Sequence, residues 1–169
     1  MSVELTIRTA RPYEYVAIGE LTARAYAPVL ADADDDPYLP ELLDAAGRAD
    51  GAELLVAVDQ EEQILGTVTI GRPGSAYAEI ARPDELEVRM LAVAPECARQ
   101  GIGGDLMSVV HQIAEREGFS GLVLSVISTN TAAAKFYDRL GYRRVAERDW
   151  FPRGDMSIVL EVFTRQVNL

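Results

Sequence analysis

A strand signal, a cluster of glycines and an amphipathic helix follow one another in the middle of the chain, and this order constrains the fold more than any other feature. The segment Glu85–Val93 (ELEVRMLAV) alternates polar and apolar residues, as a half-buried strand does. Gly101, Gly103 and Gly104 follow in the loop ARQGIGG, and apolar side chains then recur at helical spacing over residues 104–117. Bare backbone N–H groups at a helix N-terminus favour anions, so this order predicts a site for phosphate oxygens.

The spacing of this loop excludes several other glycine motifs. A dinucleotide fingerprint would need a third glycine at position 106, which is leucine, and no Gly-Lys-Ser/Thr follows as in a P-loop. Residues 118–122 (GFSGL) lack the final glycine of a nucleophile elbow. The acidic run 32–36 begins like a calcium loop, but Pro37 and Leu43 replace its turn glycine and closing glutamate, so we expect no metal there. The remaining alternative is that the glycines only make a tight turn into the helix.

Strand and helix signals alternate along the whole chain without a repeat or a linker. This order predicts a single domain over residues 1–169 of the α/β (α+β) class: one mixed, mostly antiparallel sheet of six to seven strands, flanked by about four helices. The predicted strands are 5–8, 53–58, 64–70, 85–93, 122–127, 143–148 and 157–163. The predicted helices follow Pro12 and cover 104–117 and 131–140, with a short helix over 41–46 in an otherwise irregular segment.

Composition limits the chemistry and the partners. With one cysteine (Cys97) and one histidine (His111), an internal disulfide or a Cys/His zinc site is not expected, so proton chemistry falls to Glu, Asp or Tyr. The formal charge of −11 disfavours nucleic acids and anionic membranes and favours cationic partners. No apolar run is long enough to span a membrane and the N-terminus has no signal-peptide pattern, so we expect a cytoplasmic protein.

Two segments resemble the cofactor motifs of the GCN5-related N-acetyltransferase (GNAT) family. Residues 85–107 resemble its acetyl-CoA-binding strand, loop and helix, and residues 128–145 (STNTAAAKFYDRLGYRRV) resemble its second motif, including the Leu-Gly-Tyr ending. The resemblance implies a GNAT-like fold. It also implies acetyl-CoA as cosubstrate, with the acetyl group passing to a primary amine of a small molecule or peptide by direct attack in a ternary complex. The alternative is an acyl-CoA-binding sensor or partner module with little catalysis.

The resemblance implies which residues hold the cofactor. Leu91, Ala92 and Val93 end the strand that, in this family, separates from its neighbour and offers backbone groups to the pantetheine and the thioester. The loop and helix entry would bind the pyrophosphate, mostly through backbone N–H groups. The residues assigned to that part are Arg99, Gln100, Gly101, Ile102, Gly103 and Gly104. The family commonly has a basic residue where this chain has Ala98, and whether Arg99 replaces it stays open.

The second motif implies further site residues. Asn130, a plausible N-cap, would contact the pantetheine arm, and Ala133 and Phe136 complete the assigned cofactor residues, although Phe136 also fits a packing role. Tyr137 lies two helical turns after Asn130, on the same side, and the resemblance makes it the acid that protonates the CoA thiolate. A tyrosine on an apolar stripe also fits a simple core role.

Glu87 lies where some members of the family place the glutamate that deprotonates the amine, directly or through water. Strand alternation puts Glu87, Arg89 and Leu91 on one face, so Glu87 could instead pair with Arg89 or a neighbouring strand. Glu85 and Glu79 are weaker candidates for the base.

The irregular segment 28–51 corresponds to the part of the family that usually builds the acceptor site. Asp34, Asp35 and Tyr38 are therefore assigned to the acceptor, and a polyamine, an amino sugar or a basic peptide N-terminus would be drawn to the acids. The same acids also fit a merely solvated loop. The segment 157–163 (SIVLEVF) would offer an edge for a homodimer if it is uncovered.

Overall fold

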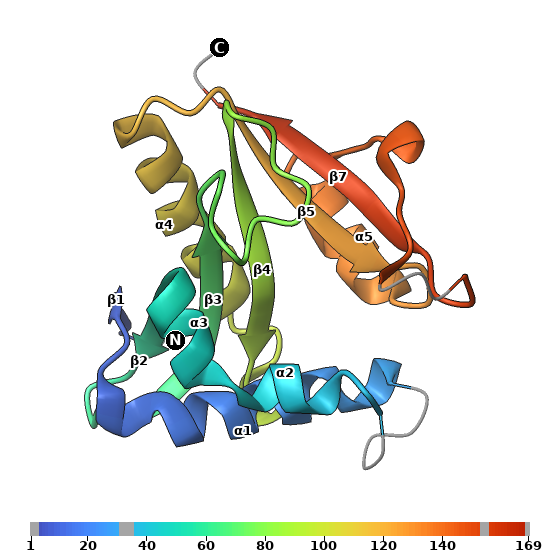
Figure 1. Cartoon of the computed structure of the whole chain (residues 1–169). Coiled ribbons are helices and arrows are strands. Elements are labelled where there is room, and N and C mark those ends of the chain that lie inside the picture. The colour runs from blue at the N-terminus through green and yellow to red at the C-terminus, as the bar shows by residue number, and fades with distance from the viewer. Residues whose placement is uncertain (1–3, 31–35, 153–155, 168–169) are drawn as a thin grey trace.

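One seven-stranded sheet runs through the computed structural model, which describes residues 4–30, 36–152 and 156–167 (Figure 1). The strand order is β1-β2-β3-β4-β5-β7-β6, and every neighbouring pair is antiparallel except β4 with β5. The predicted mixed, mostly antiparallel sheet is thus confirmed. The strands are β1 (Thr6–Thr9), β2 (Glu53–Val58), β3 (Ile64–Gly71), β4 (Glu85–Val93), β5 (Gly121–Ile127), β6 (Arg143–Arg144) and β7 (Leu160–Gln166).

Five α-helices in the described part of the chain cover the two faces of the sheet: α1 (Tyr15–Tyr26), α2 (Leu39–Leu43), α3 (Ala45–Gly51), α4 (Ile102–Arg116) and α5 (Thr131–Arg139). Ile18 of α1 and Ala45 of α3 pack with Val56 on one face. Leu106 of α4 and Tyr137 of α5 belong to the core on the opposite face. Among the described residues, no helix is long and apolar enough to cross a membrane.

Two helices, α2 and α3, stand where the sequence predicted one short helix over 41–46. Asp44 separates them, because its backbone leaves the helical region at ψ 65° and its carboxylate caps the next helix by accepting from the Gly47 N–H at 2.9 Å. The predicted strand over 143–148 is shortened to β6, which is followed by the 3₁₀ turn Ala146–Arg148 (η4). The last strand, β7, lies between β5 and β6, so it is covered and the condition under which it would offer an edge for a dimer is not met.

The parallel ladder between β4 and β5 is short. It pairs Glu85 with Gly121 and ends with Val88 opposite Leu124. Beyond this point β4 stays paired with β3, and β5 stays paired with β7, so the two halves of the sheet separate, as Figure 1 shows. The carboxyl-terminal half of β4 therefore has one edge without a strand partner.

A β-bulge lies in that half of β4. Met90 has a positive φ of 52°, and the register with β3 shifts between Thr67 and Thr69. A bulge adds one residue to a strand and so reverses the alternation of its side chains.

The reversal corrects one expectation from the sequence. Before the bulge, Val88 faces the core under α4, and after it Leu91 packs against the same core, whereas Ala92 packs with Leu21 of α1. Leu91 therefore does not share a face with Glu87 and Arg89, as simple alternation had predicted.

Arg148, in η4, forms an ion pair at the end of the sheet where β4 and β5 are paired. Its guanidinium donates to both oxygens of the Glu85 carboxylate at 2.8 Å and to the Ile80 carbonyl at 2.8 Å. Both charged side chains are close to nine-tenths buried. Burial disfavours the charged carboxylate, but the Arg148 hydrogen bonds and the Arg82 N–H outweigh it and keep the pKa of Glu85 below its ordinary value.

Replacing Arg148 with alanine should therefore destabilise the fold by about 3–5 kcal/mol at neutral pH, because a buried carboxylate loses its partner. Urea unfolding measures the difference. Since the folded-state pKa of Glu85 is lowered, its contribution is present above the unfolded-state pKa and is lost as pH falls through the folded-state value. Arg143→Ala, at an exposed position of β6, is the matched control, with an expected change within about 0.5 kcal/mol. Equal effects of the two substitutions would contradict this interpretation.

Candidate functional site

The loop before α4 presents a row of free backbone donors. Among the described residues, no acceptor contacts the N–H groups of positions 99–104, and the first helical bond of this turn runs from Asp105 N–H to the Gly101 carbonyl. Gly101, the N-cap, has φ 81° and makes no side-chain cap, and Arg99 also has a positive φ of 67°. Free N–H groups at the positive end of a 15-residue helix form a site suited to phosphate oxygens.

Gly103 joins this loop to the other predicted parts of the site. A Cβ at this position would lie 3.2 Å from Cζ of Phe136 on α5 and 3.7 Å from Cγ2 of Val93 at the end of β4. The structure thus brings together the loop, the strand end and the second motif at Gly103. Gly66 of β3 allows the same close packing from below, since its Cβ would lie 3.0 Å from the Ile102 side chain and 3.2 Å from the Ala92 carbonyl.

Helix α5 begins at Asn130 and carries Tyr137 into the core. The Asn130 side-chain oxygen accepts from the Ala133 N–H at 3.1 Å, so this predicted cofactor residue also caps the helix. Tyr137 is 8% exposed, and its ring lies edge-on to Phe136 at 5.1 Å and to Tyr142 at 5.5 Å. Burial, reinforced by the hydroxyls of Tyr26 and Tyr142, raises the pKa of Tyr137 well above 10, so the phenol is protonated at neutral pH.

Tyr26, at the end of α1, is a residue that the sequence did not single out. Its hydroxyl donates to the Leu91 carbonyl at 3.2 Å, on the stretch of β4 beyond the parallel ladder. Burial raises the pKa of Tyr26, so it remains a donor over the whole physiological range. Nothing in the sequence around Tyr26 distinguishes it from a packing aromatic, because the bond depends on how α1 crosses the sheet.

Glu87 is the most deeply buried carboxylate of the three candidates for a base. It is 3% exposed, and its Oε1 accepts from the N–H groups of Ile80 at 2.8 Å and Ala81 at 2.9 Å. Burial raises the pKa of Glu87, against the opposing effects of these N–H groups and the positive charge of Arg89.

The other two candidates are engaged elsewhere. Glu85 pairs with Arg148, as described above. Glu79 is exposed, and its carboxylate lies 3.8 Å from the guanidinium of Arg89, which stands 5.7 Å over the ring of Tyr77.

The acceptor residues predicted from the sequence are described in part. Asp34 and Asp35 lie outside the described residues. Tyr38 precedes α2, is partly buried, and its N–H donates to the Asp36 carboxylate at 2.8 Å. Tyr38 contributes to the pKa shifts of Tyr26 and of Arg48. Arg48 is a buried side chain on α3 that was not predicted from the sequence.

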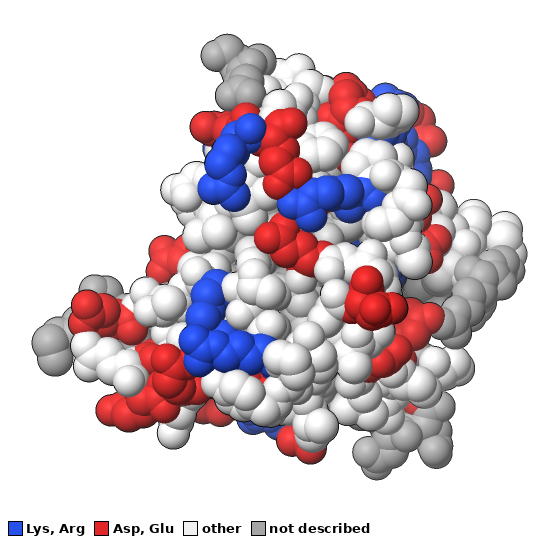
Figure 2. All heavy atoms as spheres, turned by 60° about the vertical axis from the view of Figure 1, so that its left-hand side comes forward, with Lys and Arg blue, Asp and Glu red and all other residues white. Residues whose placement is uncertain are grey.

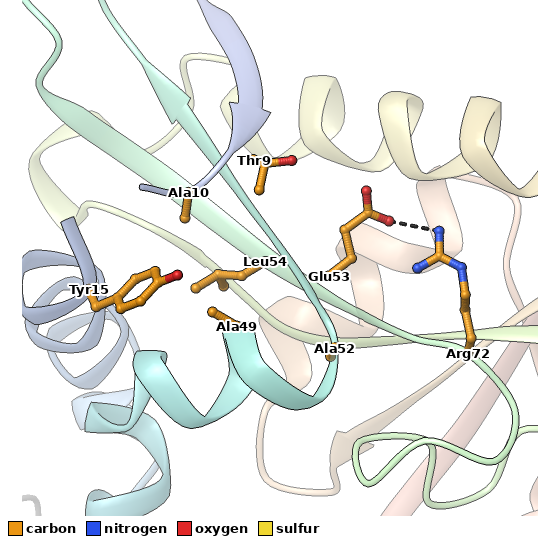
Figure 3. A pocket seen from close by; sticks show the side chains of 8 residues that line it. All are labelled: Thr9, Ala10, Tyr15, Ala49, Ala52, Glu53, Leu54 and Arg72. Atoms are coloured by element: carbon orange, nitrogen blue, oxygen red, sulfur yellow. Dashed lines mark hydrogen bonds and ion pairs between the residues drawn. The ribbon is translucent and has the colours of Figure 1, made fainter. Parts of the chain in front are cut away.

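A separate hollow of about 290 Å³ lies away from this junction (Figure 3). Tyr15 stands at one end of it, and an ion pair between Glu53 and Arg72, with 2.8 Å between nitrogen and oxygen, stands at the other. Its lining is Thr9, Ala10, Tyr15, Ala49, Ala52, Glu53, Leu54 and Arg72. None of the site residues predicted from the sequence is in that lining.

Charges of both signs are interspersed on the face shown in Figure 2. Basic side chains there have acidic ones beside them, and no broad basic patch covers this face. Such a surface does not match the phosphate backbone of a nucleic acid.

Known proteins similar to this chain are acetyltransferases. A model described as the acetyltransferase (GNAT) family matches residues 16–142. A mycothiol acetyltransferase of Salinispora tropica is 33% identical over an alignment 148 positions long, which covers 73% of this chain and 45% of that relative, so the chain spans less than half of its length. A GNAT-family acetyltransferase structure from Staphylococcus aureus has a TM-score of 0.75 at 17% identity, covering 98% of this chain and all of that one.

A further solved structure carries a ligand. It is a proposed acetyltransferase of Salmonella typhimurium with its cofactor acetyl-CoA, and it matches with a TM-score of 0.66 at 21% identity over 97% of this chain and 94% of the other. At this identity the likeness establishes a shared fold.

The raised pKa of Glu87 leads to a test of its electrostatic environment. Above its folded-state pKa the buried charge costs stability. This cost shrinks as pH falls below that value and is gone below the unfolded-state pKa. Glu87→Gln keeps an oxygen acceptor for the Ile80 and Ala81 N–H groups, so the variant should be more stable than the wild type at neutral pH. The difference in urea unfolding free energy should shrink as the pH is lowered.

Glu87→Ala is the control, because it removes the acceptor as well as the charge and should destabilise the protein at every pH. A Glu87→Gln variant that is less stable at neutral pH would show that the charge itself is stabilising.

Proposed function

Because the chain belongs to the GNAT acetyltransferase family, we propose that it transfers an acetyl group from acetyl-CoA to a primary amine of a small molecule or peptide. The observation that carries the proposal is the junction at Gly103, where the free N–H groups of residues 99–104 lie beside the end of β4 and beside α5. Acetyl-CoA has parts that match each of these: a pyrophosphate, an extended amide-containing arm and a thioester. The thioester supplies an activated acetyl group, and CoA is released as the thiol.

The loop fits the pyrophosphate by the chemistry of its donors. Six consecutive positions, 99–104, offer N–H groups without an acceptor among the described residues, and the Arg99 side chain is exposed next to them. In this assignment Arg99 adds a positive charge where Ala98 cannot, and Leu91, Ala92 and Val93 offer the free edge of β4 to the arm. Asn130, Ala133 and Phe136 border the arm from α5.

Two buried groups fit the proton transfers. The acceptor must lose a proton before its nitrogen lone pair can attack, and Glu87, whose pKa is raised by burial, is the carboxylate that we assign to this step, directly or through water. The departing thiolate must gain a proton, and the protonated phenol of Tyr137 is the group that we assign to it. The ammonium nitrogen loses two protons in all: one to Glu87 before the attack, and a second as the tetrahedral intermediate collapses to the amide. The second proton restores the phenol of Tyr137 after it has protonated the thiolate, so the amide, the CoA thiol and one released proton are the products.

The acceptor is proposed to bind at α1, α2 and α3 and at the segment between α1 and α2. Asp34, Asp35 and Tyr38 are proposed to attract and contact the ammonium form of the acceptor. The proposal further takes the whole chain, residues 1–169, as one catalytic domain that acts in the cytoplasm on a freely diffusing acceptor. The alternative is a module that binds acyl-CoA as a sensor or partner, and it differs by predicting binding without turnover.

Binding of acetyl-CoA should depend on the Gly103 junction. Gly103→Leu forces a side chain against Phe136 and Val93, so the dissociation constant measured by calorimetry should rise by about tenfold or more. Ser108→Leu, at an exposed position of α4, is the matched control and should bind as the wild type does. Arg99→Ala should weaken binding by about threefold through one lost charge contact. No measurable affinity of the wild type for acetyl-CoA or CoA would contradict both the enzyme and the sensor.

Turnover should depend on the Tyr137 hydroxyl. Tyr137→Phe keeps the ring packing and should lower kcat by about a hundredfold, with the dissociation constant of acetyl-CoA changed by no more than about twofold. Tyr142→Phe removes a neighbouring buried hydroxyl and should leave kcat nearly unchanged. Steady-state kinetics on an accepted amine measures both variants, and an unaltered kcat for Tyr137→Phe would exclude this residue as the acid.

A further inference from the structure

Arg48 of α3 is a buried arginine with an incomplete set of partners. The residue is 1% exposed, and Nη1 donates to the Glu41 carbonyl at 2.6 Å. Its other two nitrogens, Nε and Nη2, are buried without a hydrogen-bond partner among the described residues. They are two of the five such side-chain atoms in that part of the chain.

The two unpartnered nitrogens have a defined geometry. Nε–H and one N–H of Nη2 lie parallel on one edge of the planar guanidinium, the edge that pairs with both oxygens of a carboxylate. Among the described residues, Arg48 forms no ion pair; the nearby acid Asp44 instead accepts from the Gly47 N–H. Burial accordingly lowers the pKa of Arg48, although Asp44 and the hydroxyls of Tyr77, Tyr38 and Tyr26 oppose the effect. A buried cation without a counterion is costly, so this edge is suited to an anionic ligand.

Arg48 lies beside the proposed acceptor site. Gly51 is one turn further along α3, and a Cβ there would lie 3.0 Å from the ring of Tyr77, over which Arg89 of β4 stands. Tyr26 is an electrostatic neighbour of Arg48, and its hydroxyl bonds to Leu91 on β4. Tyr26 is likewise a neighbour of Tyr137. Electrostatic interaction with Tyr26 thus connects the guanidinium to the hydroxyl that bonds to the unpaired half of β4.

We propose that the Nε and Nη2 edge of Arg48 binds a carboxylate of the acceptor, so that the acceptor is an amino acid or a similar small molecule carrying both an amine and a carboxylate. This proposal rests on the proposed function, since it names the substrate class of that site. The amine end would lie toward Leu91 of β4 and the carboxylate end toward α3. Tyr38 and Tyr77, which interact electrostatically with Arg48, are both partly exposed to solvent.

The test compares free L-amino acids with their carboxamides as acceptors, using the full chain and saturating acetyl-CoA, with CoA release as the readout. For the amino acid that is turned over best, kcat/KM should exceed that of its amide by about tenfold or more, as expected for a desolvated Arg–carboxylate pair. Arg48→Met, which keeps an unbranched side chain of similar length, should bring the acid-to-amide ratio close to one. Arg24→Met, at an exposed arginine of α1, is the control and should keep the wild-type ratio.

Several results would overturn the proposal. If the wild type uses amides or simple amines such as spermidine better than any amino acid, the proposed carboxylate of the acceptor is contradicted. The proposed amine acetylation would still hold. An Arg48→Met variant with an unchanged ratio would show that Arg48 has only a structural role. No CoA release with any amine, with or without a carboxylate, would contradict the proposed function instead.

A binding measurement distinguishes failure of the carboxylate proposal from failure of the proposed acetyl transfer. N-acetyl amino acids and their amides can be compared on the CoA-loaded protein by ligand-observed NMR. Binding of the acid form alone, lost in Arg48→Met, supports the carboxylate site even without turnover, and absence of that preference overturns it.

Discussion

The early end of the parallel ladder between β4 and β5 leaves one edge of β4 without a strand partner, and the proposed binding site depends on this edge. After Val88 and Leu124 the two strands follow different partners, so the last residues of β4 expose one edge within a sheet that is otherwise continuous. Backbone polar groups at such an edge need partners. One is supplied by Tyr26, whose hydroxyl donates to the Leu91 carbonyl, and the rest of the edge is available to an extended ligand.

The same constraint explains why glycines and backbone donors dominate the neighbouring loop. Helix α4 must begin close to both β4 and α5, and Gly103 and Gly66 permit this approach because their missing side chains leave room for Phe136 and Ile102. The N–H groups of residues 99–104 then have no acceptor among the described residues. A phosphate-bearing ligand would satisfy them without a basic side chain at position 98.

Local patterns in the sequence predicted the elements that depend on local physics. The strand Glu85–Val93, the helix α4 and the Asn130 cap each follow from alternation, helical spacing or capping chemistry, and the structure has all three. The bulge at Met90 could not be predicted, because its positive φ is imposed by the register with β3. Tyr26 and Arg48 were missed for a related reason: their burial and partners arise where α1 and α3 pack against distant residues. The roles assigned to Glu87 and Tyr137 stay predictions, since their burial fits catalysis and packing alike.

The central claim is that the loop amides, the free edge of β4 and α5 form one binding site for CoA. The most direct measurement is a titration of the ¹⁵N-labelled protein with CoA, followed through backbone amide chemical shifts. The largest shifts should fall on residues 99–104, with smaller ones on Leu91–Val93 and the first turn of α5. Largest shifts around Thr9, Glu53 and Arg72, in the separate hollow, with the loop amides unchanged, would contradict the claim.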